Sequence, residues 1–347
     1  MRLAITFLFF SCIALATEKS HAIFLSEYGV TSASLGSTCA VFPIASDALF
    51  CSPIWIATEK NDKPGFKGNF FFGNDISNTG ETMRLASGNA SAADVKSIFS
   101  THQNSYLSSN LELGYTASTW AFSYIPARVI YYSQFNNEAL PELHLFASVE
   151  KEARAQMASY VQNDVFLGLQ LRYINRKFIS GQFFLTDVLA ENGNSLLESK
   201  NQDNVFLEPS IAYIPDGNDW TPSVVASVEN LGWISKNYNE FPSSPKLNLG
   251  SSIVLFQQGK QKLAAGINAG YDRDSRDIIS PLGIGSIYQY GALRLSGSLH
   301  EYRSSAGFIV VYKNVETGLV YVNQTVDSNG FKNLKVQNVY MTLGATL

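Results

Sequence analysis

The chain has 347 residues, of which 46% are hydrophobic, 13% aromatic and 16% charged. Its formal net charge of −4 and the absence of a basic stripe argue against a nucleic-acid-binding protein. Charged residues are sparse and interspersed, and apolar residues come in short alternating runs rather than in blocks. This distribution fits two soluble domains poorly, but it is typical of strands with one face in lipid and the other in a polar lumen.

The first 22 residues have the three regions of a secretory signal peptide. Met1 and Arg2 precede an apolar run over residues 3–16, and a polar stretch follows over residues 17–22. The apolar run is shorter than the ~20 residues that a membrane-spanning helix needs. Cleavage could follow Ala16 or Ala22, and we favour Ala22 because the polar stretch then serves as the cleavage region. We therefore expect residues 1–22 to be absent from the mature protein.

Residues 23–62 form a distinct segment that is rich in Ser, Ala and Gly and has few alternating runs. Such a segment is too irregular to be a lipid-facing strand, so we expect a plug or lid. It contains Cys39 and Cys51, the two cysteines that remain after cleavage. In an oxidising periplasm they could form a disulfide worth ~2–3 kcal/mol, or they could be two small buried apolar side chains. The sequence leaves both alternatives open.

The rest of the chain, residues 63–347, shows the alternation of an all-β protein. In the run 165–173, Leu167, Leu169 and Leu171 share one face, while Gly168, Gln170 and Arg172 share the other. A period of two fits a strand and not a helix. Several runs are ~9–13 residues long, which matches a tilted membrane strand and exceeds the usual strand of a soluble protein. We therefore predict a transmembrane antiparallel β-barrel.

Fourteen runs are strand candidates, and single-chain barrels have even strand numbers, so we predict about 14 strands, with 12 or 16 as alternatives. The run 142–157 could also be an amphipathic helix, but we favour a strand with Glu150, Glu152 and Arg154 in the lumen. Tyr131, Tyr132, Tyr213, Tyr271 and Tyr340 lie near run ends, where interfacial girdles would place them. The candidates are 66–73, 109–117, 119–133, 142–157, 163–174, 177–187, 205–214, 221–230, 246–257, 261–271, 286–300, 305–313, 316–324 and 335–347.

Several short motifs of the N-terminal segment resemble the hatch of the FadL-type outer-membrane transporters of long-chain fatty acids and hydrocarbons. They are Phe24-Leu-Ser-Glu-Tyr28, Ser34-Leu-Gly36, Ile44-Ala-Ser-Asp-Ala48 and Ser52-Pro53. The resemblance implies a bacterial outer-membrane barrel, surrounded by lipid, whose plugged lumen takes up small hydrophobic compounds such as fatty acids. It assigns hatch positions to Glu27, Tyr28, Leu35, Gly36, Asp47, Ser52 and Pro53.

The sequence departs from the family pattern within the last of these motifs. Ser52 stands where the family has Asn, and Ile54 where it has Ala. The porin-V-like barrels of secretion systems and the TraF-like barrels encoded with conjugation genes resemble the chain in the same segment. They imply an alternative function, in which the barrel transports nothing and docks with proteins of an envelope machine. Both functions remain open at this point.

Enzymatic chemistry has little support in the sequence. His144 and His300 share strand faces with Ser148, Ser296 and Ser298, and a Ser–His pair would suit an outer-membrane lipase. Such a pair must lie on the outer face near the bilayer, whereas the alternation points these residues inward. The chain has no His-x-Glu-x-x-His, no Cys-x-x-Cys and no phosphate-binding Gly motif. We therefore expect neither enzymatic activity nor a metal or other cofactor.

Overall fold

The computed structural model describes residues 29–42, 51–57, 65–75, 104–136, 142–162, 164–184, 199–215, 222–238, 241, 244–272, 280–301, 303–328 and 331–346. The expected signal peptide, Glu27, Tyr28 and Asp47 lie outside these residues. Among the helices of the described residues, none is long and apolar enough to cross a membrane.

Strands make up most of the described chain, and three short helices precede them. The helices are α2 (Val30–Leu35), η1 (Gly36–Val41) and η3 (Pro53–Ala57). The strands are β1 (Gly65–Asp75), β2 (Asn104–Thr116), β3 (Trp120–Asn136), β4 (Glu142–Gln162), β5 (Val165–Phe184), β6 (Lys200–Tyr213), β7 (Ser223–Glu229), β8 (Leu231–Ile234), β9 (Lys246–Gln258), β10 (Gln261–Asp272), β11 (Ser280–Tyr290), β12 (Leu293–His300), β13 (Arg303–Tyr312), β14 (Val315–Ser328) and β15 (Phe331–Thr346).

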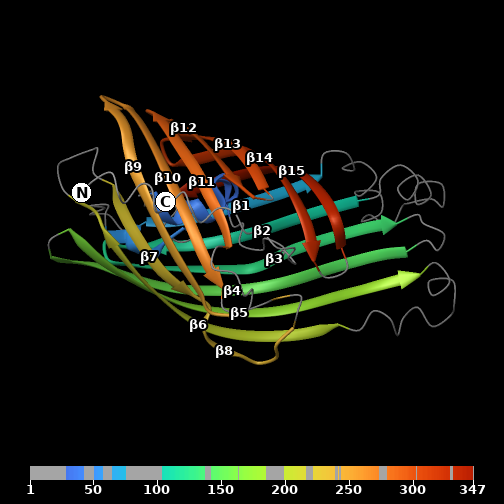
Figure 1. The fold of residues 1–347 in the computed structure, drawn as a ribbon. Helices are drawn as coiled ribbons and strands as arrows, with labels where there is room; N and C mark the ends of the chain where they lie inside the picture. The colour runs from blue at the N-terminus through green and yellow to red at the C-terminus, as the bar shows by residue number, and fades with distance from the viewer. Residues whose placement is uncertain are drawn as a thin grey trace, which may run out of the picture.

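The strands form one closed antiparallel barrel (Figure 1). Apart from β8, consecutive strands pair with each other, and the ring closes because β1 pairs with both β2 and β15. Strands β7 and β8 both pair with β6 and are separated only by Asn230, whose φ of 57° interrupts the strand. Counting β7 and β8 as one wall position gives the 14 strands that the sequence predicts.

Two of the predicted strand divisions are nevertheless wrong. The runs 163–174 and 177–187 are a single strand, β5, which continues through Asn175 and Arg176. The run 286–300 is two strands, β11 and β12, with a turn at residues 291–292. The ambiguous run 142–157 is a strand, as favoured, and belongs to β4.

Side chains alternate between the lumen and the outer surface, as expected. On β5, Leu167, Leu171 and Tyr173 are exposed on the outside, while Gly168 and Gln170 are buried. The expectation of interfacial girdles is wrong for Tyr132 and Tyr340. Their side chains are 1% and 0% exposed, because their positions in the alternation point them into the lumen.

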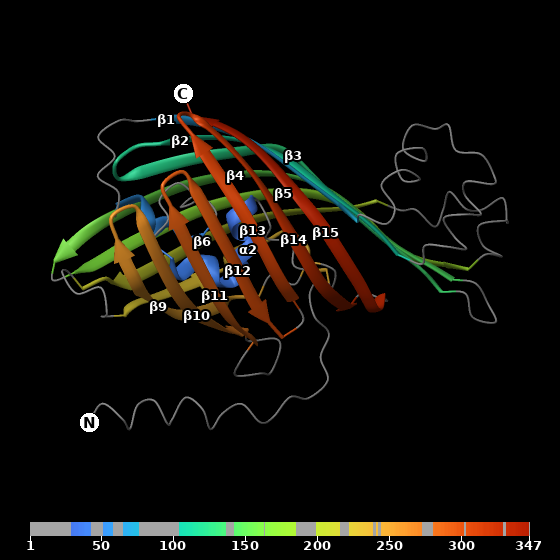
Figure 2. The same ribbon diagram turned by 90° about the horizontal axis from the view of Figure 1, so that it is seen from above.

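The two ends of the barrel differ. At one end, which we call the turn end, short turns such as residues 259–260, 291–292 and 313–314 join the strands. At the other, the loop end, most connections are longer, for example residues 185–199 between β5 and β6 and residues 235–245 between β8 and β9. Outer-membrane barrels have short turns on the periplasmic side and longer loops outside. Figure 2 shows the barrel from above, with the β9–β10 and β11–β12 hairpin turns on the same side of the view.

Candidate functional site: the lumen of the barrel

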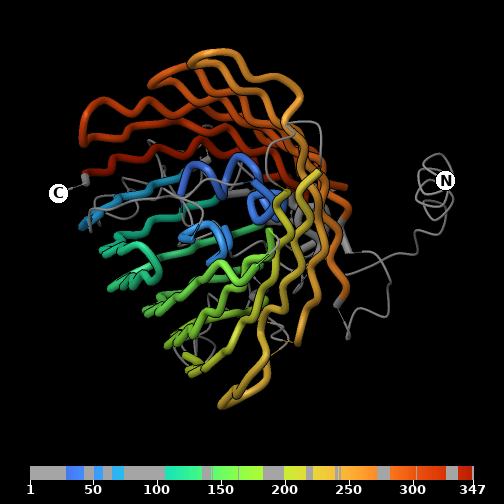
Figure 3. Tube along the Cα trace, turned by 90° about the vertical axis from the view of Figure 1, so that its left-hand side faces the viewer, coloured from blue at the N-terminus to red at the C-terminus, as the bar shows by residue number. Residues whose placement is uncertain are grey.

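The lumen holds the N-terminal segment of the described chain. We call residues 29–42 and 51–57 the lumenal segment, and Figure 3 shows it enclosed by the strands. Helix α2 contacts β12 to β15, η1 contacts β7 and β9 to β11, and η3 contacts β4 to β6. The segment therefore reaches opposite walls of the barrel.

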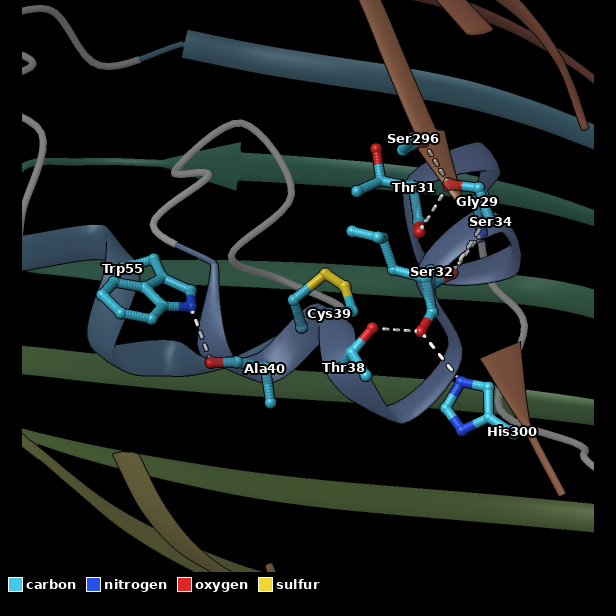
Figure 4. The surroundings of a disulfide bond; sticks show 12 residues. Gly29, Thr31, Ser32, Ser34, Thr38, Cys39, Ala40, Trp55, Ser296 and His300 are labelled. Atoms are coloured by element: carbon cyan, nitrogen blue, oxygen red, sulfur yellow. Dashed lines mark hydrogen bonds between the residues drawn. A yellow bond between two sulfur atoms is a disulfide. The ribbon is translucent and has the colours of Figure 1, made fainter. Parts of the chain in front are cut away.

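Polar side chains of the wall bind the backbone of the lumenal segment. Ser305 Oγ donates to the Ser34 carbonyl at 2.8 Å, and Ser252 Oγ donates to the Val41 carbonyl at 2.7 Å. The Arg303 guanidinium donates to the Ala33 carbonyl, and His300 Nε2 lies 3.2 Å from the Leu35 carbonyl oxygen (Figure 4). The contacts with Ala33, Ser34 and Leu35 satisfy carbonyls at the end of α2, where the helix itself supplies no donor.

A disulfide between Cys39 and Cys51 joins the two parts of the lumenal segment (Figure 4). The indole of Trp55 reinforces this link, because Trp55 Nε1 donates to the Ala40 carbonyl at 3.0 Å. Both Trp55 and Ile54 are 0% exposed and pack with Leu35 in one apolar cluster. The segment is thus held together covalently, by a hydrogen bond and by its own core.

Gly36 is a position of the segment where a larger side chain would not fit. Its φ is 56°, and a Cβ there would lie 2.4 Å from Arg303 Nη1 and 2.7 Å from His300 Nε2. We expect Gly36→Ala to lower the free energy of unfolding by about 2–4 kcal/mol, the left-handed backbone accounting for about 1–2 kcal/mol of this and the displaced Arg303 for the rest.

Gly259→Ala is the matched control, because Gly259 has a φ of 58° and nothing within 4 Å of its Cβ position. It should cost only the backbone term, about 1–2 kcal/mol. Urea titration in lipid vesicles, followed by tryptophan fluorescence, measures both losses. Equal losses in the two variants would contradict the role given to the Arg303 contact.

A belt of buried and partly buried charged and amide side chains lines the lumen on β2 to β6. At its centre, Glu150 on β4 lies between two arginines: Arg176 Nε is 2.5 Å from Glu150 Oε1, and Arg128 Nη1 is 3.4 Å from Glu150 Oε2. Each of these buried charges therefore has an opposite charge beside it, as buried charges require. We call this the polar belt, and its members are Glu112, Arg128, Glu150, Glu152, Arg154, Gln156, Gln170, Arg172, Arg176 and Glu208.

Beside the polar belt, six adjacent strands each place one aromatic ring in the lumen. Tyr106 and Tyr132 lie 4.5 Å apart between ring centroids, and Phe71 stacks on Tyr340 at 4.7 Å. The Tyr106 and Tyr340 hydroxyls are 2.8 Å apart and hydrogen-bonded. We call this stripe the aromatic arc, formed in wall order by Tyr340, Phe71, Tyr106, Tyr132, Phe146 and Phe178.

The order of residues along β4 shows how the lumen is layered. Ala158, nearest the turn end, belongs to the apolar cluster of the lumenal segment, and Phe146, nearer the loop end, belongs to the aromatic arc. The inward residues between them are Gln156, Arg154, Glu152, Glu150 and Ser148. On this wall the lumen thus changes from the apolar cluster of the lumenal segment through the polar belt to the aromatic arc. Val30 and Ala33 of α2 pack in the same cluster as the arc.

The structure brings some of the predicted site residues together. Leu35, Ser52 and Pro53 are buried, Gly36 is partly buried, and all four belong to the lumenal segment. His144 and Ser148 lie at different positions of β4, and His144 is 3.0 Å from Glu142. Ser296, on β12, contacts Ser34 at 2.5 Å. Among the described residues, no group of three or more His, Cys, Asp and Glu is placed to hold a metal ion.

Sequence reasoning missed the aromatic arc. Five of its six members lie in the predicted runs, and Tyr106 lies just before the run 109–117, but the rings are separated by tens of residues in the sequence. Only the register of neighbouring strands, such as Tyr106 opposite Tyr132 and Tyr132 opposite Phe146, brings the rings to one level.

The comparisons with known proteins address the fold. No protein-family model matches the chain, and no curated protein matches it. Among solved structures, the toluene transporter TodX of P. putida matches with a TM-score of 0.52 at 12% identity, over 93% of this chain and 97% of that chain. The deltaS2S3 mutant of the monoaromatic hydrocarbon channel TodX matches with a TM-score of 0.56 at 12% identity, over 93% and 99%.

A third solved structure, the monoaromatic hydrocarbon channel CymD, matches with a TM-score of 0.53 at 12% identity, over 93% of this chain and 97% of that chain. At such low identity these likenesses concern the fold. The chain has the fold of the FadL-type outer-membrane channels, which confirms the fold inferred from its N-terminal motifs.

Proposed function

We propose that the chain is an outer-membrane channel for the passive uptake of small hydrophobic compounds, and that the lumenal segment is its hatch. The observation that carries the proposal is the contact between the aromatic arc and α2. Val30 and Ala33 are 2% and 0% exposed and pack with the rings of the arc. An apolar surface therefore borders the hatch inside a lumen that also carries the polar belt, and such a surface suits an apolar ligand.

The chemistry of the neighbours supports the same proposal. The solved channels with this fold are a toluene transporter and monoaromatic hydrocarbon channels by name. Fatty acids are a second candidate class, since the hatch motifs resemble those of fatty acid transporters. In this proposal the signal peptide exports the chain, the loop end faces outward, and a ligand meets the aromatic arc before the hatch.

Uptake by cells tests the proposal. Cells that express the chain in their outer membrane should accumulate radiolabelled toluene or dodecanoate several-fold faster than cells with an empty vector. Uptake of a small sugar should not change, because the hatch blocks polar solutes. Equal uptake of both hydrophobic compounds with and without the chain would contradict transport and favour the docking function.

A further inference from the structure

Described residues of the connection between β8 and β9 lie in the loop end of the lumen. Gln202, an inward residue of β6 that is 0% exposed, donates from Nε2 to the Lys236 carbonyl at 2.8 Å. Further along the connection, the Phe241 amide donates to the Tyr238 carbonyl at 3.1 Å. The side chain of Phe241 lies inward, where it is 2% exposed.

Phe241 inserts into one end of the aromatic arc. Its ring centroid lies 4.9 Å from that of Phe178 and 5.4 Å from that of Phe146. Edge-to-face and tilted contacts of this kind are the favourable arrangements of aromatic rings. Phe146 and Phe178 belong to strands of the wall, whereas Phe241 belongs to a connection. The ring of Phe241 can therefore leave without breaking any strand pairing.

Two cations face the rings at this place. The Arg176 guanidinium carbon lies 3.6 Å from the centroid of Phe241, and Lys200 Nζ lies 5.7 Å from that of Phe178 and 5.6 Å from that of Tyr238. Arg176 is held by Glu150 and by Gln202, whose Oε1 accepts from Arg176 Nη1 at 2.9 Å. A cation is attracted electrostatically to the π face of an aromatic ring, and it has no comparable attraction to an aliphatic group.

We propose that Phe241 is a resident ring in a binding site for small neutral aromatic compounds, and that such a compound binds by displacing it. A single benzene ring matches the side chain of Phe241 in size and in its π face. It would pack on Phe146 and Phe178 and take the place of Phe241 beside Arg176. The inference rests on the proposed function, because it names the class of compound that the channel takes and the residue that competes with it.

Fluorine NMR on the protein in lipid nanodiscs tests the site directly. The probes are fluorobenzene and fluorocyclohexane, which differ in the π system, and empty nanodiscs give the partition baseline. In Phe241→Ala the competing ring is gone, so we expect fluorobenzene to bind about tenfold more tightly than in the wild type. The variant should prefer fluorobenzene over fluorocyclohexane by about fivefold, because Arg176 then faces the ligand ring.

Phe71→Ala is the matched control. Phe71 is a buried ring at another place in the arc, where it stacks on Tyr340. Any large apolar cavity can bind benzene, but a cavity at Phe71 should show no preference for the aromatic probe. The inference is overturned if Phe241→Ala binds fluorobenzene no more tightly than the wild type, or if both variants show the same preference.

The outcome is separable from that of the proposed function. Cells that take up toluene while Phe241→Ala gains no affinity would overturn the resident-ring site and leave the channel standing. Tight and selective binding of fluorobenzene by Phe241→Ala, without uptake by cells that express the wild type, would support the site and overturn transport.

Discussion

A barrel that lacks residues 29–57 is expected to conduct ions and small sugars, whereas the full chain is not. The three helices of the lumenal segment contact β4 to β7 and β9 to β15, so they occupy the lumen from wall to wall. A closed barrel of 14 strands has an interior that wall side chains alone do not fill. Without the segment we expect the ionic current per barrel in planar bilayers to rise about tenfold or more.

The barrel should survive this deletion because the strand pairings that close it do not involve the segment, and the wall groups that hydrogen-bond to the segment are polar. Ser252, His300, Arg303 and Ser305 would exchange a backbone carbonyl for water, at little net cost for each hydrogen bond. The matched control is the double variant Cys39→Ser and Cys51→Ser, which removes the disulfide but keeps the contacts of both parts with the wall. It should remain closed. If the full chain and the deletion variant conduct equally, the lumenal segment is no hatch.

The strand number was predictable, but partly because two errors cancel. Asn175 and Arg176 look like a polar turn in the sequence, yet both side chains are used within the sheet. Asn175 donates to Asp203 at 2.8 Å, and Arg176 pairs with Glu150. One strand was therefore counted as two. Gly291 and Ala292 form a tight hairpin turn, with Gly291 at a φ of 57°, but carry no polar side chain to mark it. Two strands were therefore counted as one.

The alternation predicted which residues face the lumen but not what they do there. Glu150, Glu152 and Arg154 were expected on the lumenal face, and all three are buried on it. Their partners could not be predicted, because the contact of Arg176 with Glu150 depends on the register of β4 and β5. The same holds for Phe241. Nothing in the local sequence of a loop indicates that it folds back into a barrel, since its apolar partners come from distant strands.

Within the polar belt, we expect Glu150 to be the residue on which the stability of the barrel depends strongly. This side chain is 1% exposed and is paired with both Arg128 and Arg176, which are 2% and 7% exposed. In Glu150→Gln the two guanidinium groups stay buried without the carboxylate between them. Removing one partner of a buried ion pair typically costs about 3–5 kcal/mol, because an uncompensated charge remains in a place that water reaches poorly. We expect a loss of this size in the free energy of unfolding.

Glu316→Gln is the control that separates the effect of burial from the loss of an ion pair as such. Glu316 pairs with Lys67 at 3.6 Å, but both side chains are 14% exposed at the turn end, where β14 begins. An ion pair that water can reach contributes about 1 kcal/mol or less. Urea titration in lipid vesicles should therefore give a loss several times larger for Glu150→Gln than for Glu316→Gln. Similar losses would mean that water screens Glu150 as well, and that the polar belt is a hydrated wall of the channel rather than a buried network.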